Sequence, residues 1–428
     1  MGKIIYDLAG IGIGPFNLGL AALSSQLPNF KSIFFDTKSS FEWHPGMMID
    51  GTTLQVPFYA DLVTLADPCN PFSFICFLTA MGRLFPFAIK ENNYVSRKEY
   101  NQYCQWVAKQ LHNLHFGYSV GEIFFNEENN CFKIATTDIQ NKSEQIFYAK
   151  RIVLGTGMKP YIPDSVNNAI DKNVFHSSEY LFRRNGLLLK SVITIIGSGQ
   201  SAAEIFYDLL QNWHNEDKTL QWFTKSRQFF PMDVSKFSCE FSTPDYINYF
   251  YNLSASTKQR VLANQQHLFK GINSSLLQEI YDLLYEKLID NNQKQITLMT
   301  NCELHHIEKN NCNTYSMHLF QAEKKQTFCH NAEAVILATG YRYVIPEFIE
   351  PIRDKIRWTS EQLYDVDKNY SISKGCKNIF VQNAEMHTHG FNAPDLGLGT
   401  YRNAVILNEI LGYERFCVSK RNTFQSFA

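Results

Sequence analysis

Two glycine-rich turns have the residue types and the setting needed to hold a phosphate. One follows the apolar run 4–11, the other follows the apolar run 192–196, and a helical pattern begins after each turn. Backbone N–H groups at a helix N-terminus would then face the anion. The candidate positions are Gly12, Gly14, Pro15 and Asn17 in the first turn and Gly197, Gly199, Gln200 and Ser201 in the second. Two such turns predict two dinucleotides, most simply a flavin and the nicotinamide that reduces it.

The strand that follows each turn indicates which dinucleotide binds there. The first of these strands, 32–35, ends at Asp36, whose carboxylate suits a ribose hydroxyl of a flavin adenosine or of NAD. The second, 220–223, runs into Lys225 and Arg227, and two cations would attract the 2′-phosphate of NADPH. A solvated basic turn is the alternative for that pair. We therefore expect FAD at the first turn and NADPH at the second.

Length, charge and cysteine content exclude several classes of protein. The 428 residues suffice for two or three domains, and a net charge of -1 predicts no nucleic-acid partner. The ten cysteines form no C-x-x-C pair, so neither a zinc site nor a disulfide framework is indicated, and a reduced, cytoplasmic setting is expected. No uncharged apolar stretch reaches the roughly 18 residues of a spanning helix, so no membrane span is predicted.

The elements that must position these turns follow an α/β pattern. Strands at 151–154 and 333–337 also end in small residues, and we expect the chain to pass between two nucleotide units there. From 233 to 291 helical spacing dominates, which predicts a helical insertion. The predicted fold is two Rossmann-like dinucleotide-binding domains with a small helical substrate region. The expected ranges are 1–165 and 370–428 for the FAD domain, 166–232 and 292–369 for the NADPH domain, and 233–291 for the substrate region.

Two histidines near the C-terminus, His387 and His389, invite a metal interpretation. One residue separates them, so their side chains would point the same way only on a strand, and no third ligand is identifiable nearby. We therefore predict no metal and interpret His389 as part of a polar wall of the flavin pocket.

Longer stretches of the chain resemble the microbial N-hydroxylating flavin monooxygenases of siderophore synthesis. The stretches that carry the resemblance are 7–18 (DLAGIGIGPFNL), 41–47 (FEWHPGM), 54–58 (LQVPF), 61–64 (DLVT), 70–74 (NPFSF), 96–100 (SRKEY), 197–204 and 338–341 (ATGY). It continues into the C-terminal segment and covers nearly the whole chain. It implies that NADPH reduces FAD, that the reduced flavin adds molecular oxygen to form a C4a-hydroperoxyflavin, and that this species hydroxylates a primary amine. It also implies FAD contacts at Trp43, His44, Gln55, Gly397 and Leu398, besides those in the first turn.

A departure from the family pattern concerns the substrate. Members that act on ornithine have the run Leu-Gln-x-x-Phe-x-Lys-Asp-Leu, whose lysine holds the substrate carboxylate, and this chain has Ala60 at that position. A buried carboxylate without a charged partner is costly, so we expect a substrate that lacks one. Putrescine, cadaverine and histamine meet this condition, and segment 387–399 is most similar to the diamine-hydroxylating branch. Hydroxylation of lysine or ornithine is the alternative.

The amine pocket imposes two further requirements. A free alkylammonium has a pKa of about 10.4, so the site must favour the neutral amine, and the sequence identifies no base for this. The far ammonium of a diamine needs an acceptor, for which Asp61 and Glu240 are candidates, although either carboxylate could equally be structural. Gln55, Ala60 and His389 complete the expected pocket.

Two other classes of protein compete with this interpretation. A flavin-dependent disulfide or quinone reductase uses the same two nucleotide folds, but the chain lacks a redox C-x-x-C pair. A flavin-binding sensor without turnover would not need a second nucleotide site. The protein is expected to form a homo-oligomer.

Overall fold

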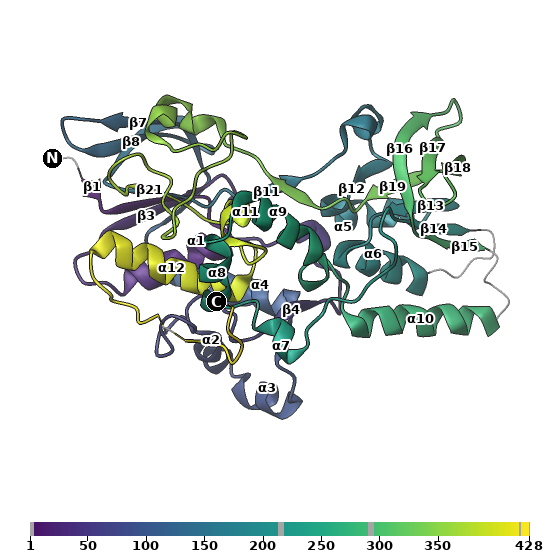
Figure 1. The fold of residues 1–428 in the computed structure, drawn as a ribbon, viewed down its shortest axis with the longest axis horizontal. Helices are drawn as coiled ribbons and strands as arrows, with labels where there is room; N and C mark the ends of the chain where they lie inside the picture. The colour runs from purple at the N-terminus through teal and green to yellow at the C-terminus, as the bar shows by residue number, and fades with distance from the viewer. Residues whose placement is uncertain (1–3, 213–217, 290–294, 419–420, 428) are drawn as a thin grey trace.

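The computed structural model describes residues 4–212, 218–289, 295–418 and 421–427. Two α/β bodies lie side by side (Figure 1), and each is built on a five-stranded parallel sheet. This confirms the predicted α/β class with two Rossmann-like units. None of the described helices combines the length and the apolar character that crossing a bilayer requires.

The first body carries the first glycine turn. Its sheet has the order β21-β10-β2-β3-β6. These strands are β2 (Leu8–Ile11), β3 (Ser32–Asp36), β6 (Leu114–Phe116), β10 (Ile152–Leu154) and β21 (Ile379–Val381). Alternate residues face opposite sides, so Phe34 packs among helices while Ile33 and Phe35 pack against antiparallel strands. Those helices are α1 (Pro15–Ser25), α4 (Arg97–Gln110) and α12 (Leu396–Leu411), and those strands are β7 (Tyr118–Asn126), β8 (Cys131–Asp138) and β9 (Ser143–Ala149), with β1 (Ile5–Tyr6) at their edge.

The second body repeats this construction around the second glycine turn. Its sheet has the order β12-β19-β13-β14-β15. The strands are β12 (Val174–His176), β13 (Val192–Ile196), β14 (Thr219–Phe223), β15 (Ile296–Met299) and β19 (Ala334–Leu337). One face packs on helices α5 (Tyr180–Leu187), α6 (Gln200–Gln211) and α10 (Ser274–Ile289), and the other on the antiparallel strands β16 (Cys302–Lys309), β17 (Tyr315–Gln321) and β18 (Gln326–Ala332). Burial on both faces explains why β2 and β13 are almost entirely apolar.

The first glycine of each turn is required by a crossing backbone. Gly12 has φ +90°, and an added Cβ would lie 2.4 Å from the carbonyl O of Gly155. Gly197 has φ +143°, and an added Cβ would lie 2.2 Å from the carbonyl O of Ala338. Each turn therefore passes directly over the end of the neighbouring strand, as the small residues there led us to expect.

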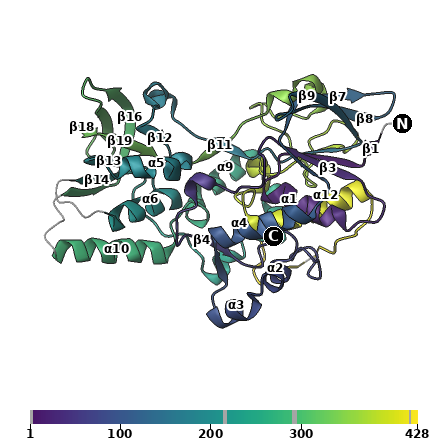
Figure 2. The same cartoon turned by 180° about the vertical axis from the view of Figure 1, so that it is seen from behind.

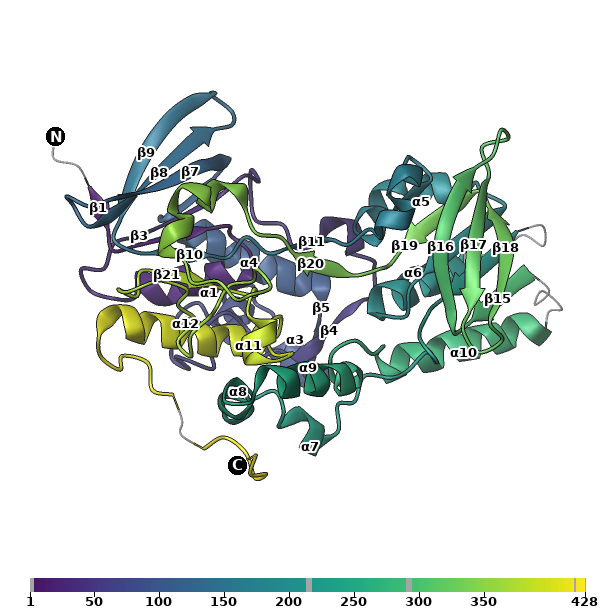
Figure 3. The same cartoon turned by 45° about the horizontal axis from the view of Figure 1, so that its top comes forward.

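A two-stranded ribbon joins the bodies. Strand β11 (Met158–Pro160) pairs antiparallel with β20 (Tyr341–Tyr343), and Figure 3 shows this ribbon in the space between the sheets. After β20 the chain packs on the first body, where Ile349 and Ile352 share a core with Ile33. The expected NADPH range, 292–369, differs from this arrangement. The segment after β20 contributes no strand to either five-stranded sheet. Its sequence pattern therefore did not indicate on which of the two bodies it packs.

The helical insertion contacts both bodies. It contains α7 (Lys236–Cys239), α8 (Pro244–Tyr251), α9 (Ala255–Asn264) and α10. Helix α8 packs against α11 (Met386–His389) of the first body, and α10 packs against α6 of the second. The expected end of this region at residue 291 lies outside the described residues. Helices α2 (Phe74–Ala80) and α3 (Leu84–Lys90) project from the underside of the first body (Figure 2).

Candidate functional site

The first turn leaves room for a ligand at its second glycine. Gly14 is the N-cap of α1, with φ −87°, and a Cβ added to it would meet no protein atom within 4 Å. Pro15 follows in the first turn of the helix, where its missing N–H costs no hydrogen bond. Asp36 ends β3 as expected, and its Oδ2 accepts the N–H of Ile13 at 2.7 Å. The helix N-terminus, the open space and the carboxylate together fit FAD.

Asn17 stands where the usual third glycine would be, and it fixes the turn from inside. Its buried amide donates to the carbonyl O of Gly12 at 2.8 Å and accepts from Nε2 of Gln382 at 2.7 Å. A Cβ added to Gly155 would lie 2.5 Å from Asn17 Nδ2. The expected contact of Asn17 with FAD stays a prediction, and its side chain is directed into the protein. Its contribution is to hold the turn in shape.

Helix α12 brings a second N-terminus to this turn. Gly397 and Leu398 lie in its first helical turn, and an added Cβ on Gly399 would lie 2.4 Å from Phe16. The first turns of α1 and α12 are therefore in contact, and their dipoles together favour an anionic or electron-rich group.

Polar atoms without partners also lie beside the first turn. The buried guanidinium of Arg402 sits over the Phe16 ring at 4.4 Å and binds Glu385 through Nη1. Within the described part of the chain, Arg402 Nε and Nη2, Gln382 Oε1 and Asn403 Oδ1 have no hydrogen-bond partner. Unpaired buried polar atoms are uncommon, so their grouping here fits a polar ligand such as FAD.

The second turn has the same open position. Gly199 caps α6 with φ −91°, and an added Cβ would meet only the carbonyl O of Lys270, at 3.9 Å. Gly197 O accepts Trp222 Nε1–H at 2.7 Å, which fixes the turn. Gln200 and Ser201 begin α6 directly after it.

Cations gather beside this turn. Lys225 and Arg227 are exposed just after β14, and Lys225 Nζ reaches only a distant partner, Glu303 Oε1, at 3.9 Å. Burial lowers the pKa of Lys270, and the charge of Lys225 lowers it further. An anion between these two lysines would relieve that repulsion, which fits the 2′-phosphate of NADPH. Sequence reasoning missed Lys270, because no motif marks the connection between α9 and α10.

The residues expected at the two cofactors meet in a polar seam. Gln55 lies on β4 (Thr53–Pro57), and its Nε2 donates to Asn273 Oδ1 at 3.0 Å and to Gln200 Oε1 at 3.4 Å. Gln200 Oε1 also accepts the N–H of Asn273, at 2.9 Å. The structure thus joins a residue predicted at FAD to one predicted at NADPH through the helical insertion.

A buried ion pair continues this seam. Gln200 Nε2 donates to Glu204 Oε1 at 2.8 Å, and both oxygens of Glu204 accept from the Arg97 guanidinium at 2.7 Å. Glu204 is 3% exposed, and burial raises its pKa although Arg97 opposes this. Arg97 begins α4 of the first body and Glu204 lies on α6 of the second. This bidentate pair therefore fixes how the two bodies face each other.

Trp43 and His44 extend from the first body toward the second. The Trp43 ring meets Tyr100 edge-on at 5.1 Å, and the His44 ring meets Tyr341 of the connecting ribbon at 5.8 Å. Tyr341 in turn lies 5.1 Å from the His176 ring. The His44, Tyr341 and His176 rings thus form a chain of contacts from the first body through the ribbon to the second, and the implied flavin contacts of Trp43 and His44 stay predictions.

Ala60 and the carboxylate of Asp395 both lie close to Gly397. Ala60 is 4% exposed, and a Cβ added to Gly397 would lie 3.3 Å from both Ala60 Cβ and Asp395 Oδ1. Asp395 caps α12 by accepting the N–H of Leu398 at 3.0 Å, and burial raises its pKa. Among the described residues no Lys, Arg or His forms an ion pair with it. Sequence reasoning missed Asp395, because an acidic residue before a helix signals only an N-cap.

Asp61 has the structural role that we had left open. The carboxylate is 3% exposed and accepts backbone N–H groups from Val63, Thr64 and Phe74 at 3.0, 2.7 and 2.7 Å. Burial raises its pKa, and these donors oppose that effect. Glu240 likewise binds backbone N–H groups, of the C-terminal segment. Both oxygens of each carboxylate are engaged by the chain itself, which argues against a role for either in holding a substrate ammonium.

His387 and His389 lie in different surroundings, and the role of His389 at the flavin stays a prediction. Both lie on the short helix α11 and diverge: His387 Nε2 contacts Tyr364 O at 2.8 Å, whereas His389 is buried and stacks on Tyr370 at 4.4 Å. Burial lowers the pKa of His389 to about 3, so the ring is neutral. Within the described ranges no three His, Cys, Asp or Glu side chains are grouped to hold a metal ion.

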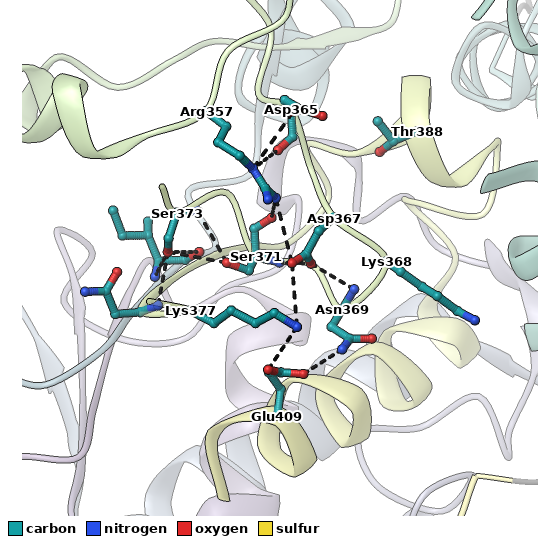
Figure 4. A network of polar contacts seen from close by, with 12 residues as sticks. Arg357, Asp365, Asp367, Lys368, Asn369, Ser371, Ser373, Lys377, Thr388 and Glu409 are labelled. Atoms are coloured by element: carbon teal, nitrogen blue, oxygen red, sulfur yellow. Dashed lines mark hydrogen bonds and ion pairs between the residues drawn. The ribbon is translucent and has the colours of Figure 1, made fainter. Parts of the chain in front are cut away.

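A polar network around Asp367 holds loop 365–373 (Figure 4). Lys377 contacts Asp367 at 3.8 Å and Glu409 of α12 at 3.0 Å, while Asn369 donates to Glu409 at 2.6 Å. Arg357 adds an ion pair with Asp367 at 3.7 Å. The loop that presents Tyr370 to His389 is thereby tied to the helix whose N-cap is Asp395.

Comparison with known proteins decides the class. Residues 4–343 match the family model described as L-lysine 6-monooxygenase/L-ornithine 5-monooxygenase. The chain belongs to this N-monooxygenase family. The putrescine N-hydroxylase of Shewanella oneidensis is 44% identical over 428 residues, which is 100% of this chain and 85% of that protein. The putrescine N-hydroxylase of Acinetobacter baumannii is 42% identical over 424 residues, which is 99% of this chain and 94% of that protein.

A solved structure agrees with this assignment. The FAD-bound cadaverine monooxygenase of the desferrioxamine pathway of Erwinia amylovora has a TM-score of 0.97 and 42% identity, and the match covers 100% of this chain and 99% of that one. Membership in the N-monooxygenase family confirms the predicted enzyme class and the cofactors FAD and NADPH. Membership also rules out the two competing classes, a flavin-dependent disulfide or quinone reductase and a flavin-binding sensor without turnover. The individual FAD and NADPH contacts stay predictions.

In this N-monooxygenase, Gly14→Ala is expected to weaken FAD binding without harming the fold. The added methyl meets open space in the protein, so the strain falls on the ligand. We expect FAD affinity at least about tenfold lower by equilibrium dialysis of the folded variant. Gly12→Ala is the contrasting variant, which should lose thermal stability, with roughly 1–2 kcal/mol from the dihedral alone. Undiminished FAD affinity in folded Gly14→Ala would place the pyrophosphate elsewhere.

Replacing Lys225 and Arg227 together with alanine is expected to raise KM for NADPH by about tenfold or more, because the 2′-phosphate loses two cations. KM for NADH should change by less than about twofold, since NADH carries no 2′-phosphate. Flavin reduction followed at varied coenzyme concentration measures both. The paired change Lys324→Ala and Lys325→Ala, at the exposed β17–β18 turn, removes the same charge and should affect neither. Equal effects on NADPH and NADH would contradict the assignment.

Proposed function

We propose that this N-monooxygenase hydroxylates one nitrogen of a small diamine that lacks a carboxylate, for a hydroxamate-type siderophore. The observation that carries the proposal is the pairing of Ala60 with Asp395 beside Gly397. Where ornithine hydroxylases resembling this chain have a lysine, this pocket has a methyl group and a nearby carboxylate. When Asp395 is ionised, the charge that the pocket offers to the far end of the substrate is negative.

That charge selects among amines by its sign. Two opposite unit charges about 4 Å apart gain about 4 kcal/mol at an effective dielectric constant near 20. The distal ammonium of putrescine or cadaverine would gain this attraction, and it would also lower the raised pKa of Asp395. The α-carboxylate of ornithine or lysine would instead face a like charge, with no lysine at position 60 to compensate.

The relatives support the same order of substrates. Two of them are named for hydroxylation of putrescine and one for oxidation of cadaverine. Histamine also lacks a carboxylate, but an imidazole has a pKa of about 6.5 and is largely neutral at neutral pH. It would pair weakly with Asp395, so we place histamine below the diamines. Lysine and ornithine remain the alternative substrates.

The residues of the chain have positioning roles in this reaction. When bound, FAD uses electrons from NADPH to activate oxygen, one atom of which reaches the amine and the other leaves as water. Gly14 and Gly199 leave room for the two pyrophosphates, and the seam from Gln55 to Glu204 holds the two cofactor sites toward each other. A diamine anchored at Asp395 would present its other nitrogen to the first body. That nitrogen must be neutral to attack, and burial among apolar groups favours its neutral form.

Two further expectations belong to this proposal. The homo-oligomer and the cytoplasmic setting stay predictions. Neither affects the chemistry argued from Ala60 and Asp395.

A competition among amines tests the proposal. Putrescine, cadaverine, histamine, ornithine and lysine are mixed at equal concentration with enzyme, FAD and NADPH, and the hydroxylated products are quantified by mass. We expect putrescine and cadaverine to exceed ornithine and lysine by about tenfold or more. Product is counted rather than NADPH, because an uncoupled flavin oxidises NADPH without hydroxylating anything.

Ala60→Lys extends this test. The new ammonium would lie beside Asp395 and pair with it, so diamine turnover should fall while ornithine turnover rises only weakly. If ornithine or lysine gave the most hydroxylated product in the unmodified enzyme, the missing-cation argument would be wrong.

A further inference from the structure

The C-terminal segment 422–427 lies across the start of the helical insertion. Glu240, directly after α7, accepts two consecutive backbone N–H groups, from Phe424 to Oε1 at 2.9 Å and from Gln425 to Oε2 at 3.0 Å. These donors lower the pKa of Glu240. Asp245 Oδ2 on α8 accepts the N–H of Asn422 at 2.7 Å. Figures 1 and 3 both show the end of the chain beside α7 and α8.

An aromatic contact completes the attachment. The Phe427 ring lies 5.3 Å from Phe241, 5.1 Å from Tyr246 and 6.1 Å from Tyr249. By contrast Phe424 is 90% exposed. The segment therefore has one side bound to the insertion and one side in solvent, as expected of a strap rather than of a core element.

The elements beneath this strap lead to the proposed amine pocket. Asn392 Nδ2 donates to Phe241 O at 2.9 Å, and Phe391 stacks on Phe269 of the insertion at 5.5 Å. Asp395 follows Asn392 on the same loop. Cys239, the residue before Glu240, lies within electrostatic range of Asp395. The strap and the Asp395 loop thus contact the same short stretch, 239–241, from different sides.

We propose that residues 422–427 form a strap that, through Glu240, holds stretch 239–241 against the Asp395 loop and so shapes the amine pocket. Glu240 is then a positioning residue, not the acceptor of the substrate ammonium that the sequence suggested. Its carboxylate is used by the strap, and its effect reaches the substrate through Phe241, Asn392 and Asp395. The inference rests on the proposed function only in naming the pocket as the diamine site.

The test uses two substitutions in the full chain. Glu240→Gln replaces one accepting oxygen with an NH2 group. One backbone N–H of the strap then faces a second donor instead of an acceptor. Phe427→Ala removes the aromatic anchor. Phe424→Ala is the matched control for Phe427→Ala, because that ring is exposed, and Glu323→Gln is the control for Glu240→Gln, because Glu323 is exposed on the β17–β18 turn.

The expected result separates binding from electron transfer. Both strap variants should raise KM for putrescine roughly tenfold and give less hydroxylated product per NADPH, because Glu240→Gln loses a hydrogen bond to a charged group and Phe427→Ala loses the aromatic contact. The rate of flavin reduction by NADPH should stay unchanged, because the NADPH turn is not touched. Amide hydrogen exchange of residues 236–251 should become faster in both variants and remain unchanged in both controls.

Two outcomes would overturn the inference. In the first, hydrogen exchange of residues 236–251 becomes faster in both strap variants, which shows that the strap has been released, but KM for putrescine and the product yield stay unchanged. The other is exchange of 236–251 that is as slow in both strap variants as in the unmodified enzyme. Failure of the proposed function would look different, since the unmodified enzyme would then make no hydroxylated putrescine, while hydrogen exchange would still report on the strap.

Discussion

The buried ion pair between Arg97 and Glu204 is the constraint on which the arrangement of the two cofactor sites depends. Each nucleotide turn can form within its own body, because each is fixed by a glycine crossing a neighbouring strand. Electron transfer, however, requires the two turns to face each other. A thin ribbon and the helical insertion connect the bodies, Met47 and Ile49 of the first body pack in the core of the second, and the bidentate pair at 2.7 Å adds a buried, directional contact. Hydrogen bonds among Gln200, Asn273 and Gln55 extend this contact toward the expected FAD site.

Local features of the site could be predicted from the sequence, because they depend on residues close together in the chain. Gly12, Gly14 and the strand ending at Asp36 form one continuous unit, and so do Gly197, Gly199 and the strand before Lys225. Even here the sequence does not indicate what holds the Asn17 side chain, because its partner, Gln382, comes from the far end of the chain. A side chain's direction depends on such distant contacts, which periodicity and motif spacing do not contain.

The parts that could not be predicted are those built by long-range contacts. Asp395 signals a helix cap in the sequence, and only the fold places it beside Ala60. Glu240 was a candidate acceptor for the substrate ammonium that could equally be structural, and in the structure its carboxylate accepts the backbone N–H groups of Phe424 and Gln425. The boundary near 369 failed for a related reason, since segment 344–369 adds no strand to either five-stranded sheet.

In the proposed function, substrate choice rests on the change of charge beside Ala60. The most direct measurement is a cycle that crosses Asp395→Asn with removal of the distal ammonium, comparing putrescine with butylamine as substrates. Asparagine still caps α12, so the helix should be preserved. The account predicts that Asp395→Asn lowers kcat/KM for hydroxylated putrescine by about tenfold or more and changes that for butylamine by less than about twofold. An equal loss for both amines would contradict it, because Asp395 would then not act through the charge of the distal nitrogen.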